Sequence, residues 1–219
     1  MQEYLPVLLG MRLFEGISAE ELPPLLRCLN AIKRTYLKGA QIYRMDDPVH
    51  GAGILLSGRA QVYTEDVHGA RMIVSQLEAG ELFAESFSCA DEKLMPVAVE
   101  ALTDCAVLFV DCGRIAATCS SSCAFHNRLI RNLMRVLAEK NIQQSRKIRH
   151  LSRRSTREKL LSYLGEQAAL NRSAQFLIPF TRQELADYLC VDRSAMSAEL
   201  SKLQREGVLS YHKSAFKLR

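Results

Sequence analysis

The sequence predicts an α+β chain built from an antiparallel β-sandwich or barrel, one long helix, and a helix pair that ends in a hairpin. Three observations predict it. Short β-like runs alternate with glycines between residues 37 and 111; residues 124–151 contain no Gly or Pro; and two short amphipathic stretches meet at a tight corner near the C-terminus. With 219 residues, the chain is long enough for two domains. We expect boundaries at 1–122, 123–151 and 152–219.

The N-terminal part reads as a short helix followed by a β-domain. Ser18 and Glu21 have the spacing of a capping box. From about Leu37, the β-like runs are AQIYRM, GILLSGRAQVYTE, ARMIVSQL and PVAVEALTDCAVLFVD, separated by Gly39, Gly51, Gly58, Gly69 and Gly80. Glycines about every ten residues between alternating strands indicate an antiparallel sandwich or barrel. The run GRAQVYTEDVHGARMIV predicts a hairpin that turns at His68-Gly69.

The long helix over 123–151 carries a narrow apolar heptad seam. Met134, Asn141 and Ile148 fall at its a positions, and Ile130, Leu137, Gln144 and Leu151 fall at its d positions. Such a seam predicts a parallel homodimer, in which Asn141 would set register at a cost in stability. The alternative is a long helix that packs only against its own β-domain.

Capping signals predict the C-terminal helices. Ser155 with Glu158 and Thr181 with Glu184 have capping-box spacing, and Asp192 is a suitable N-cap for a helix from Arg193 to about Glu206. The three-residue turn Cys190-Val191-Asp192 between two such helices predicts a helix-turn-helix. The tail GVLSYHKSAFKL predicts a two-stranded wing that turns at Lys213-Ser214.

A helix-turn-helix places the N-terminal residues of its second helix in the major groove of DNA. Charge supports this partner, because residues 126–219 hold 19 Lys and Arg against 8 Asp and Glu (19 − 8 = +11). Arginine and serine suit base edges, and residues at a helix N-terminus or with lysine charge suit phosphates. The candidate contacts to double-stranded DNA are Thr181, Arg182, Gln183, Arg193, Ser194, Ser197, Ala198, Lys202 and Lys213. The alternative is a plain helical hairpin with solvated charge.

Other classes find little support. No nucleophile elbow, GxxxxGK[ST] loop or HExxH motif occurs, so we expect no enzyme. The cysteines Cys28, Cys89, Cys105, Cys112, Cys119, Cys123 and Cys190 form no CxxC pair, and we expect no metal site and no disulfide framework. No apolar run reaches the roughly 20 residues of a membrane span, and Glu3 stands where a signal peptide carries basic charge. We therefore expect a cytoplasmic protein.

The order of these elements resembles the cyclic-AMP receptor/fumarate-nitrate regulator (CRP/FNR) family of bacterial transcription regulators. The resemblance covers nearly the whole chain and rests on Gly58, GELFAE at 80–85 and TRQELADYLCVDRSAMSAEL at 181–200. It implies an N-terminal double-stranded β-helix, a jelly roll of the cyclic-nucleotide-binding type, with a dimerisation helix and a winged helix-turn-helix. It also implies a homodimer on a two-fold-symmetric operator, switched by a small-molecule effector held between the roll and the long helix. Contact with RNA polymerase stays open.

The resemblance also locates an effector pocket. Its candidate residues are Gly80, Glu81, Leu82, Phe83, Glu85, Met95, Pro96, Val97, Asn141 and Ile142. Where nucleotide-binding relatives place Arg-Ser against the cyclic phosphate, this chain has Met95-Pro96, which offer neither a charge nor a proline N–H. Asn141 and Ile142 replace the family's hydroxyl pair, whereas Glu85 matches either a ribose ligand or a turn cap. We expect a small apolar or aromatic effector, not cyclic AMP.

Two alternatives remain, and the cofactor is unknown. A haem- or redox-responsive member of the family would need ligands such as His50, His68, Cys89 or His126, and an N-terminal iron–sulfur motif is not supported, since the N-terminal segment offers only Cys28. A regulatory subunit that binds only protein would leave the basic C-terminus without a polyanion.

The second helix of the helix-turn-helix, the recognition helix, has Ser194 and Ala198 where relatives carry Glu and often Arg. This difference predicts a DNA half-site other than the one those relatives bind.

Overall fold

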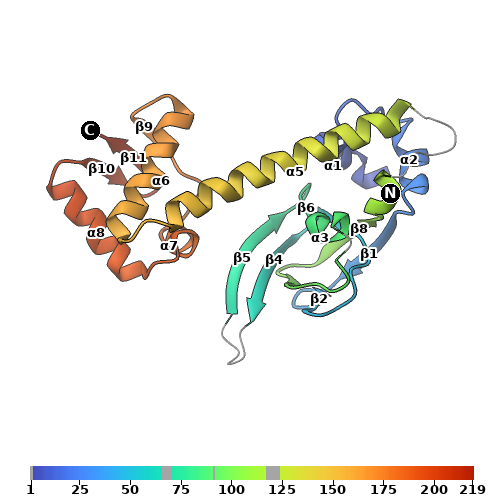
Figure 1. Ribbon diagram of the computed structural model, residues 1–219, viewed down its shortest axis with the longest axis horizontal. Coiled ribbons are helices and arrows are strands. Elements are labelled where there is room, and N and C mark those ends of the chain that lie inside the picture. Colours follow the sequence, from blue (N-terminus) through green and yellow to red (C-terminus); the bar gives the residue numbers. More distant parts are fainter. Residues whose placement is uncertain (1, 66–70, 91, 117–123) are drawn as a thin grey trace. The chain divides into compact units, whose positions relative to one another are not determined.

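The structure is a computed structural model that describes residues 2–65, 71–90, 92–116 and 124–219 (Figure 1). The chain divides into two compact units, Met1–Ala138 and Glu139–Arg219. This division falls inside the long helix α5 (Ala124–Leu151), whose two ends therefore belong to different units. The junction expected near residues 122 and 123 lies outside the described residues. The predicted α+β architecture is confirmed.

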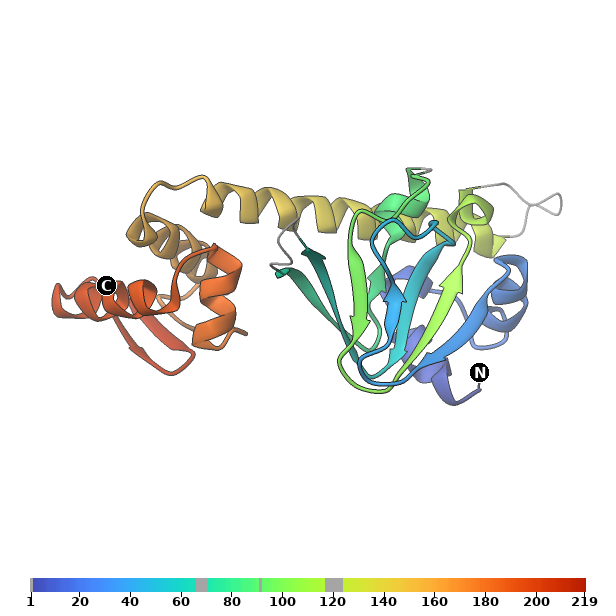
Figure 2. The same cartoon turned by 90° about the horizontal axis from the view of Figure 1, so that it is seen from below.

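The N-terminal unit is a roll of antiparallel strands (Figures 1 and 2). Its strands are β1 (Ile32–Tyr36), β2 (Gln41–Tyr43), β3 (Ala52–Ser57), β4 (Arg59–Glu65), β5 (Arg71–Glu78), β6 (Leu82–Phe83), β7 (Ala98–Ala101) and β8 (Cys105–Val110). One sheet has the order β1-β8-β3-β6 and the other β2-β7-β4-β5. Consecutive strands β3 and β4 lie in different sheets, and Gly58 between them has φ +87°, where a Cβ would meet the Asp104 carbonyl oxygen at 2.3 Å. Only glycine fits this crossing.

The predicted pairing of β4 with β5 is confirmed, with Arg59 opposite Glu78 and Glu65 opposite Arg71. The turn expected at His68-Gly69 lies outside the described residues. Strand β1 lies before residue 37, where the sequence predicted the first strand. Its residues are largely exposed and show no apolar alternation, so the sequence pattern did not indicate it. Ser18 and Glu21 do exchange the two bonds of a capping box, but the helix begins only at Leu22.

Short helices cover one end of the roll. They are η1 (Gln2–Tyr4), α1 (Leu5–Gly10), η2 (Arg12–Phe14), α2 (Leu22–Cys28), α3 (Glu85–Cys89) and α4 (Cys112–Ala116). Buried leucines of α1, η2 and α2 form one core with strands β3, β6 and β8 and with Leu129 and Leu133 of α5. The buried Asn132 amide donates to the carbonyls of Leu13 (3.1 Å) and Glu15 (2.9 Å), so α5 is held by bonds as well as by apolar contact.

The C-terminal unit adds α6 (Thr156–Asn171), β9 (Gln175–Leu177), α7 (Arg182–Leu189), α8 (Arg193–Arg205), β10 (Leu209–His212) and β11 (Ala215–Leu218). The capping boxes at Ser155 and Thr181 are confirmed, as is the wing. Strand β9 was not expected; it pairs with β11 and gives the sheet order β10-β11-β9. Within the described ranges, no helix combines the length and apolar character that crossing a bilayer requires.

Candidate nucleic-acid interface

The corner between α7 and α8 is closed by backbone bonds. Cys190 takes a left-handed conformation (φ 50°), and the N–H of Val191 donates to the Ala186 carbonyl at 3.0 Å. This arrangement satisfies carbonyls at the end of α7. The Asp192 carboxylate then accepts from the Ala195 N–H at 2.8 Å and starts α8. Fully buried Ala186 lies in the core beside Met196, so the two helices form the predicted helix-turn-helix.

One side of α8 is buried and the other is open. Met196, Leu200 and Leu203, at spacings of four and three, are fully buried in the core of the unit. The predicted DNA-contact residues of this helix lie on the remaining surface: Arg193, Ser194, Ala198 and Lys202 are exposed, and Ser197 is half-buried. The leading end of α8 is therefore not covered by the unit that carries it.

Arg182, expected to contact a phosphate, is held by the wing. Its guanidinium lies over the rings of Tyr211 (4.5 Å) and Phe216 (5.0 Å) and donates to the carbonyl of Lys213 at 2.9 Å. Burial lowers the pKa of this guanidinium, and Tyr211 opposes the shift. The contact with Tyr211 and Phe216 follows from a tertiary approach of the wing to α7, which no local pattern of the sequence contains. In this structure, Arg182 anchors the wing.

The wing turn presents a lysine. Lys213 is exposed and has φ 53°, a conformation that costs energy for a residue with a Cβ. Its backbone is held between the bond from Arg182 and the neighbouring Ser214, whose hydroxyl donates to the Phe180 carbonyl at 3.2 Å. The ammonium of Lys213 is thus carried on a fixed turn.

The remaining predicted contacts at the start of α7, Thr181 and Gln183, are both exposed. Thr181 is the exposed N-cap, and its hydrogen bonds with Glu184 lower the pKa of the Glu184 carboxyl. Gln183 is exposed, and its amide donates to the Asp187 carboxylate at 2.9 Å. The positive end of α7 and these side chains lie on the same turn of helix.

Two basic residues of α6 support the motif and were missed by the sequence analysis. Arg157 donates to Glu199 at 3.1 Å and to Glu206 at 2.5 Å, at two places along α8. Lys159 donates to the carbonyls of Leu189 (3.2 Å) and Cys190 (3.4 Å) at the corner. Their only sequence signal is position after a capping box, which does not identify partners 30 to 49 residues away.

The predicted effector residues fall in both units. In the roll, Leu82, Phe83, Glu85 and Met95 are buried, Val97 is half-buried, and Glu81 and Pro96 are exposed; Gly80 has φ +91°. Met95 belongs to the core cluster that also contains Phe83, Val99 and Phe109. Asn141 and Ile142 are exposed residues of α5 in the C-terminal unit. A pocket shared by the two groups stays a prediction.

The candidate haem ligands are dispersed. His50 and Cys89 are exposed, whereas His126 is buried with its Nε2 at 2.9 Å from the Arg114 carbonyl oxygen. His68, Cys119 and Cys123 lie outside the described residues. Within the part of the chain that the structure describes, no three His, Cys, Asp or Glu side chains gather as metal ligands would.

The heptad positions of α5 are unevenly covered. Met134 (67% exposed), Asn141, Gln144 and Ile148 (65% exposed) are open, while Ile130 and Leu137 are half-buried against the core of the N-terminal unit. Met134 and Ile148 lie two heptads apart and therefore on the same side of α5.

Comparisons with known proteins agree with this geometry. Residues 33–122 match the cyclic nucleotide-binding domain family, and residues 158–219 match the Crp-like helix-turn-helix domain family. Electron transport regulator A of Shewanella oneidensis is 22% identical over 183 residues, which cover 81% of this chain and 70% of that protein.

Two solved structures share the fold. The catabolite activator protein of Thermus thermophilus has a TM-score of 0.54 and 23% identity, with 95% of this chain and 93% of that chain covered. The c-di-GMP-responsive global regulator CLP of Xanthomonas campestris has a TM-score of 0.62 and 18% identity, with 92% of this chain and 99% of that chain covered.

A β-roll, a long helix and a winged helix-turn-helix, in this order, define a DNA-binding transcription regulator. With both domain families matched in sequence, the chain belongs to the CRP/FNR family.

The geometry of Arg182 yields a prediction. Arg182→Gln removes the ring contacts and the bond to Lys213, so amide exchange in β10 and β11 should accelerate by roughly three- to tenfold. Hydrogen–deuterium exchange of the free protein measures this, with Lys202→Gln, an exposed cation that makes no wing contact, as the control. In DNA binding, the loss of affinity in the double variant Arg182→Gln with Lys213→Ala should be smaller than the sum of the losses in the two single variants. Unchanged wing exchange together with additive losses would show that Arg182 acts as an independent phosphate contact.

Proposed function

We propose that the protein is a homodimeric, sequence-specific DNA-binding transcription regulator in which α8 enters the major groove and an effector other than cyclic AMP controls binding. The observation that carries the DNA-binding part is the open N-terminal side of α8 opposite the buried Met196, Leu200 and Leu203. An α-helix fits the major groove of B-DNA, and residues at its N-terminus reach base edges.

Base reading is assigned to Arg193, Ser194 and Ser197. The Arg193 guanidinium is exposed and suits a bidentate contact to a guanine edge. Ser194 lacks the carboxylate that would accept from a cytosine amine, so the half-site should differ from one read by Arg-Glu. Lys202 and Lys213 are exposed cations that suit phosphates, which supply affinity without sequence information.

Dimerisation is assigned to the open a positions of α5. Met134 and Ile148 lie 14 residues apart, two heptads, and Asn141 lies midway between them. Two copies paired along this seam would bury both apolar side chains and present two copies of α8, as a two-fold-symmetric operator requires. RNA polymerase is a further partner that we include in the proposal.

The effector is assigned to the roll together with α5. In the roll, Met95 and Pro96 occupy the positions where nucleotide-binding relatives hold a phosphate, and neither carries a charge. An uncharged apolar or aromatic molecule fits this composition better than a cyclic nucleotide. A haem- or redox-responsive regulator is the alternative within the family.

The DNA contact is tested on the full-length protein. With a duplex selected from a random pool, Arg193→Ala should weaken specific binding by about 10- to 100-fold, because a bidentate base contact is lost. Arg205→Ala, at the far end of the same helix, is the control and should have little effect. Fluorescence anisotropy at several salt concentrations should give a steep fall in affinity with salt. No binding of any duplex would refute the proposed function, and equal losses on specific and random DNA would reduce Arg193 to a phosphate contact.

The dimer is tested by charge. Met134→Lys or Ile148→Lys places an ammonium on the proposed seam, so analytical ultracentrifugation should show the 24.6 kDa single chain where the wild type sediments at twice that mass. Gln143→Lys is the control, since Gln143 lies on the opposite side of α5 and is also exposed. A wild type that stays a single chain at micromolar concentration contradicts the proposal.

The effector assignment is tested by calorimetry with cyclic AMP. We expect no binding at millimolar nucleotide, because Met95 and Pro96 carry no charge that could hold the phosphate. Tight binding of cyclic AMP to the wild type would overturn the assignment.

A further inference from the structure

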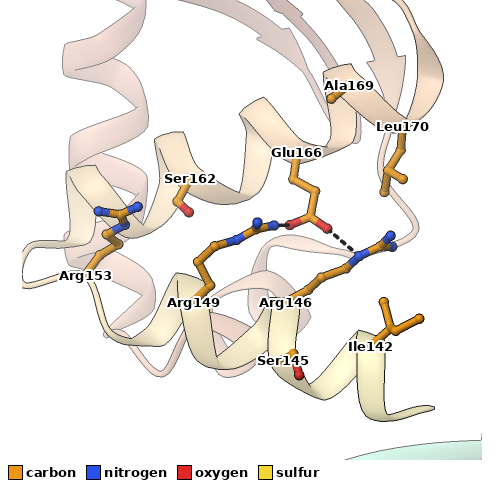
Figure 3. A pocket seen from close by; sticks show the side chains of 9 residues that line it. All are labelled: Ile142, Ser145, Arg146, Arg149, Arg153, Ser162, Glu166, Ala169 and Leu170. Atoms are coloured by element: carbon orange, nitrogen blue, oxygen red, sulfur yellow. Dashed lines mark hydrogen bonds and ion pairs between the residues drawn. The ribbon is translucent and has the colours of Figure 1, made fainter. Parts of the chain in front are cut away.

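A groove lies between the C-terminal part of α5 and α6, wholly within the C-terminal unit (Figure 3). Its volume is about 780 Å³, which is in the range of small-molecule sites. It is lined by Ile142, Ser145, Arg146, Arg149, Arg153, Ser162, Glu166, Ala169 and Leu170. Neither the DNA contacts nor the proposed dimer seam uses its arginines.

The groove is lined by one side of α5 and one side of α6, and its two ends differ in polarity. On α5, Ile142, Arg146 and Arg149 are spaced by four and three residues, which places them on one side of the helix. Arg153 follows in the bend after α5 ends at Leu151. Figure 3 shows Ile142 and Leu170 on opposite walls at one end, with the Arg146 side chain between them, and Arg153 near Ser162 at the other end. Ile142 is 51% exposed and Leu170 53% exposed. The groove therefore has a more apolar end, where Ile142 and Leu170 flank Arg146, and a cationic end at Arg153.

The charges of the groove are not balanced by its own residues. Three arginines face one glutamate, a net charge of +2 (3 − 1). The Glu166 carboxylate is already shared: Arg146 lies at 3.1 Å and Arg149 at 2.6 Å. Among the described residues, the exposed Arg153 guanidinium has no hydrogen-bonding or ionic partner. Positive charge confined in a groove raises the local concentration of anions.

Buried His150 contacts the Glu166 carboxylate and fixes its position. His150 Nε2 lies 2.9 Å from Glu166 Oε2, and its Nδ1 lies 2.8 Å from the Ser162 hydroxyl. Burial lowers the pKa of His150, so the ring is neutral at pH 7.5 and its Nε2–H donates to the carboxylate. Ser162 then donates to Nδ1. Glu166 is thus occupied on both oxygens and is not available to neutralise Arg153.

We propose that this groove binds a small apolar phosphate monoester as a free molecule, with its phosphate between Arg149 and Arg153 and its tail over Ile142, Ala169 and Leu170. A phosphate monoester carries close to two negative charges above its second pKa of about 6, which matches the net charge of the groove. Arginine binds phosphate oxygens in a bidentate manner. The apolar end removes the tail from water.

The proposed dimer leaves this groove open. Arg146 falls at an f position of the heptad and Ile142 and Arg149 at b positions, away from the a and d seam, and Arg153 lies beyond the end of α5. The groove contains no residue of the roll and shares only Ile142 with the residues predicted to hold the effector, so the phosphate monoester proposed here is a second ligand.

The test is calorimetry of the full-length protein with octyl phosphate, kept below its micelle-forming concentration at pH 7.5. Inorganic phosphate and octanol serve as probes of head and tail alone. We expect octyl phosphate to bind at least tenfold more tightly than either. Arg153→Gln should weaken it by about tenfold through loss of a charge-assisted contact, and Leu170→Ser by roughly fivefold through loss of apolar cover.

The matched controls are Arg154→Gln and Leu177→Ser, an exposed arginine and an exposed leucine that do not line the groove. Both should bind like the wild type. Among the described residues, the Arg153 guanidinium makes no hydrogen bond or ion pair, so we expect Arg153→Gln to keep the fold. Octyl phosphate that binds no more tightly than inorganic phosphate, or equally to wild type and Arg153→Gln, overturns the proposal.

A further arm distinguishes a free molecule from a lipid headgroup. Vesicles containing phosphatidic acid should retain wild type and Arg153→Gln equally, since their headgroups meet basic charge over the whole unit. Retention that depends on Arg153 would assign the groove to a membrane surface and refute a free ligand. The measurements use no DNA, so a failure of the proposed DNA contact leaves them unaffected.

Discussion

The recognition helix depends on the burial of its own back. Met196, Leu200 and Leu203 are fully buried, and each contributes about 1.5–3 kcal/mol relative to exposure. This burial sets the rotation of α8 about its axis, and therefore which residues remain on its outer surface. Arg157 donates hydrogen bonds to Glu199 within α8 and to Glu206 at its C-terminal end, so it holds this helix at two points. Because the opposite side of α8 is fully buried, the N-terminal residues of this helix remain on the outer surface.

Local rules account for what the sequence predicted well. Thr181 with Glu184, Ser155 with Glu158, and Asp192 were placed correctly because a cap bonds within three residues of itself. The long helix and the paired strands β4 and β5 followed from composition and periodicity, which are also local. The resemblance to the CRP/FNR family joined these pieces in the right order, and the two matched domain families confirm that order.

The features that escaped prediction all depend on distant contacts. Strand β9 is only three residues long and is defined by pairing with β11, which no short window of sequence can report. Arg182 reads as a cation at a helix start, yet Tyr211 and Phe216 approach it from the wing some 30 residues later. Exposed β1 lacked apolar alternation and was identified by its partner β8 alone. The groove beside α5 requires both helix walls.

Helix α5 contributes residues to both compact units without an intervening loop. Its last turns supply Arg146, Arg149 and His150 to the shared carboxylate of Glu166, so they are structural parts of the DNA-binding half. A fragment begun at residue 152 would therefore strip α6 of its neighbours and leave Glu166 unneutralised. To isolate that half intact, a protease site or an expression boundary belongs near residue 139, which lies inside α5.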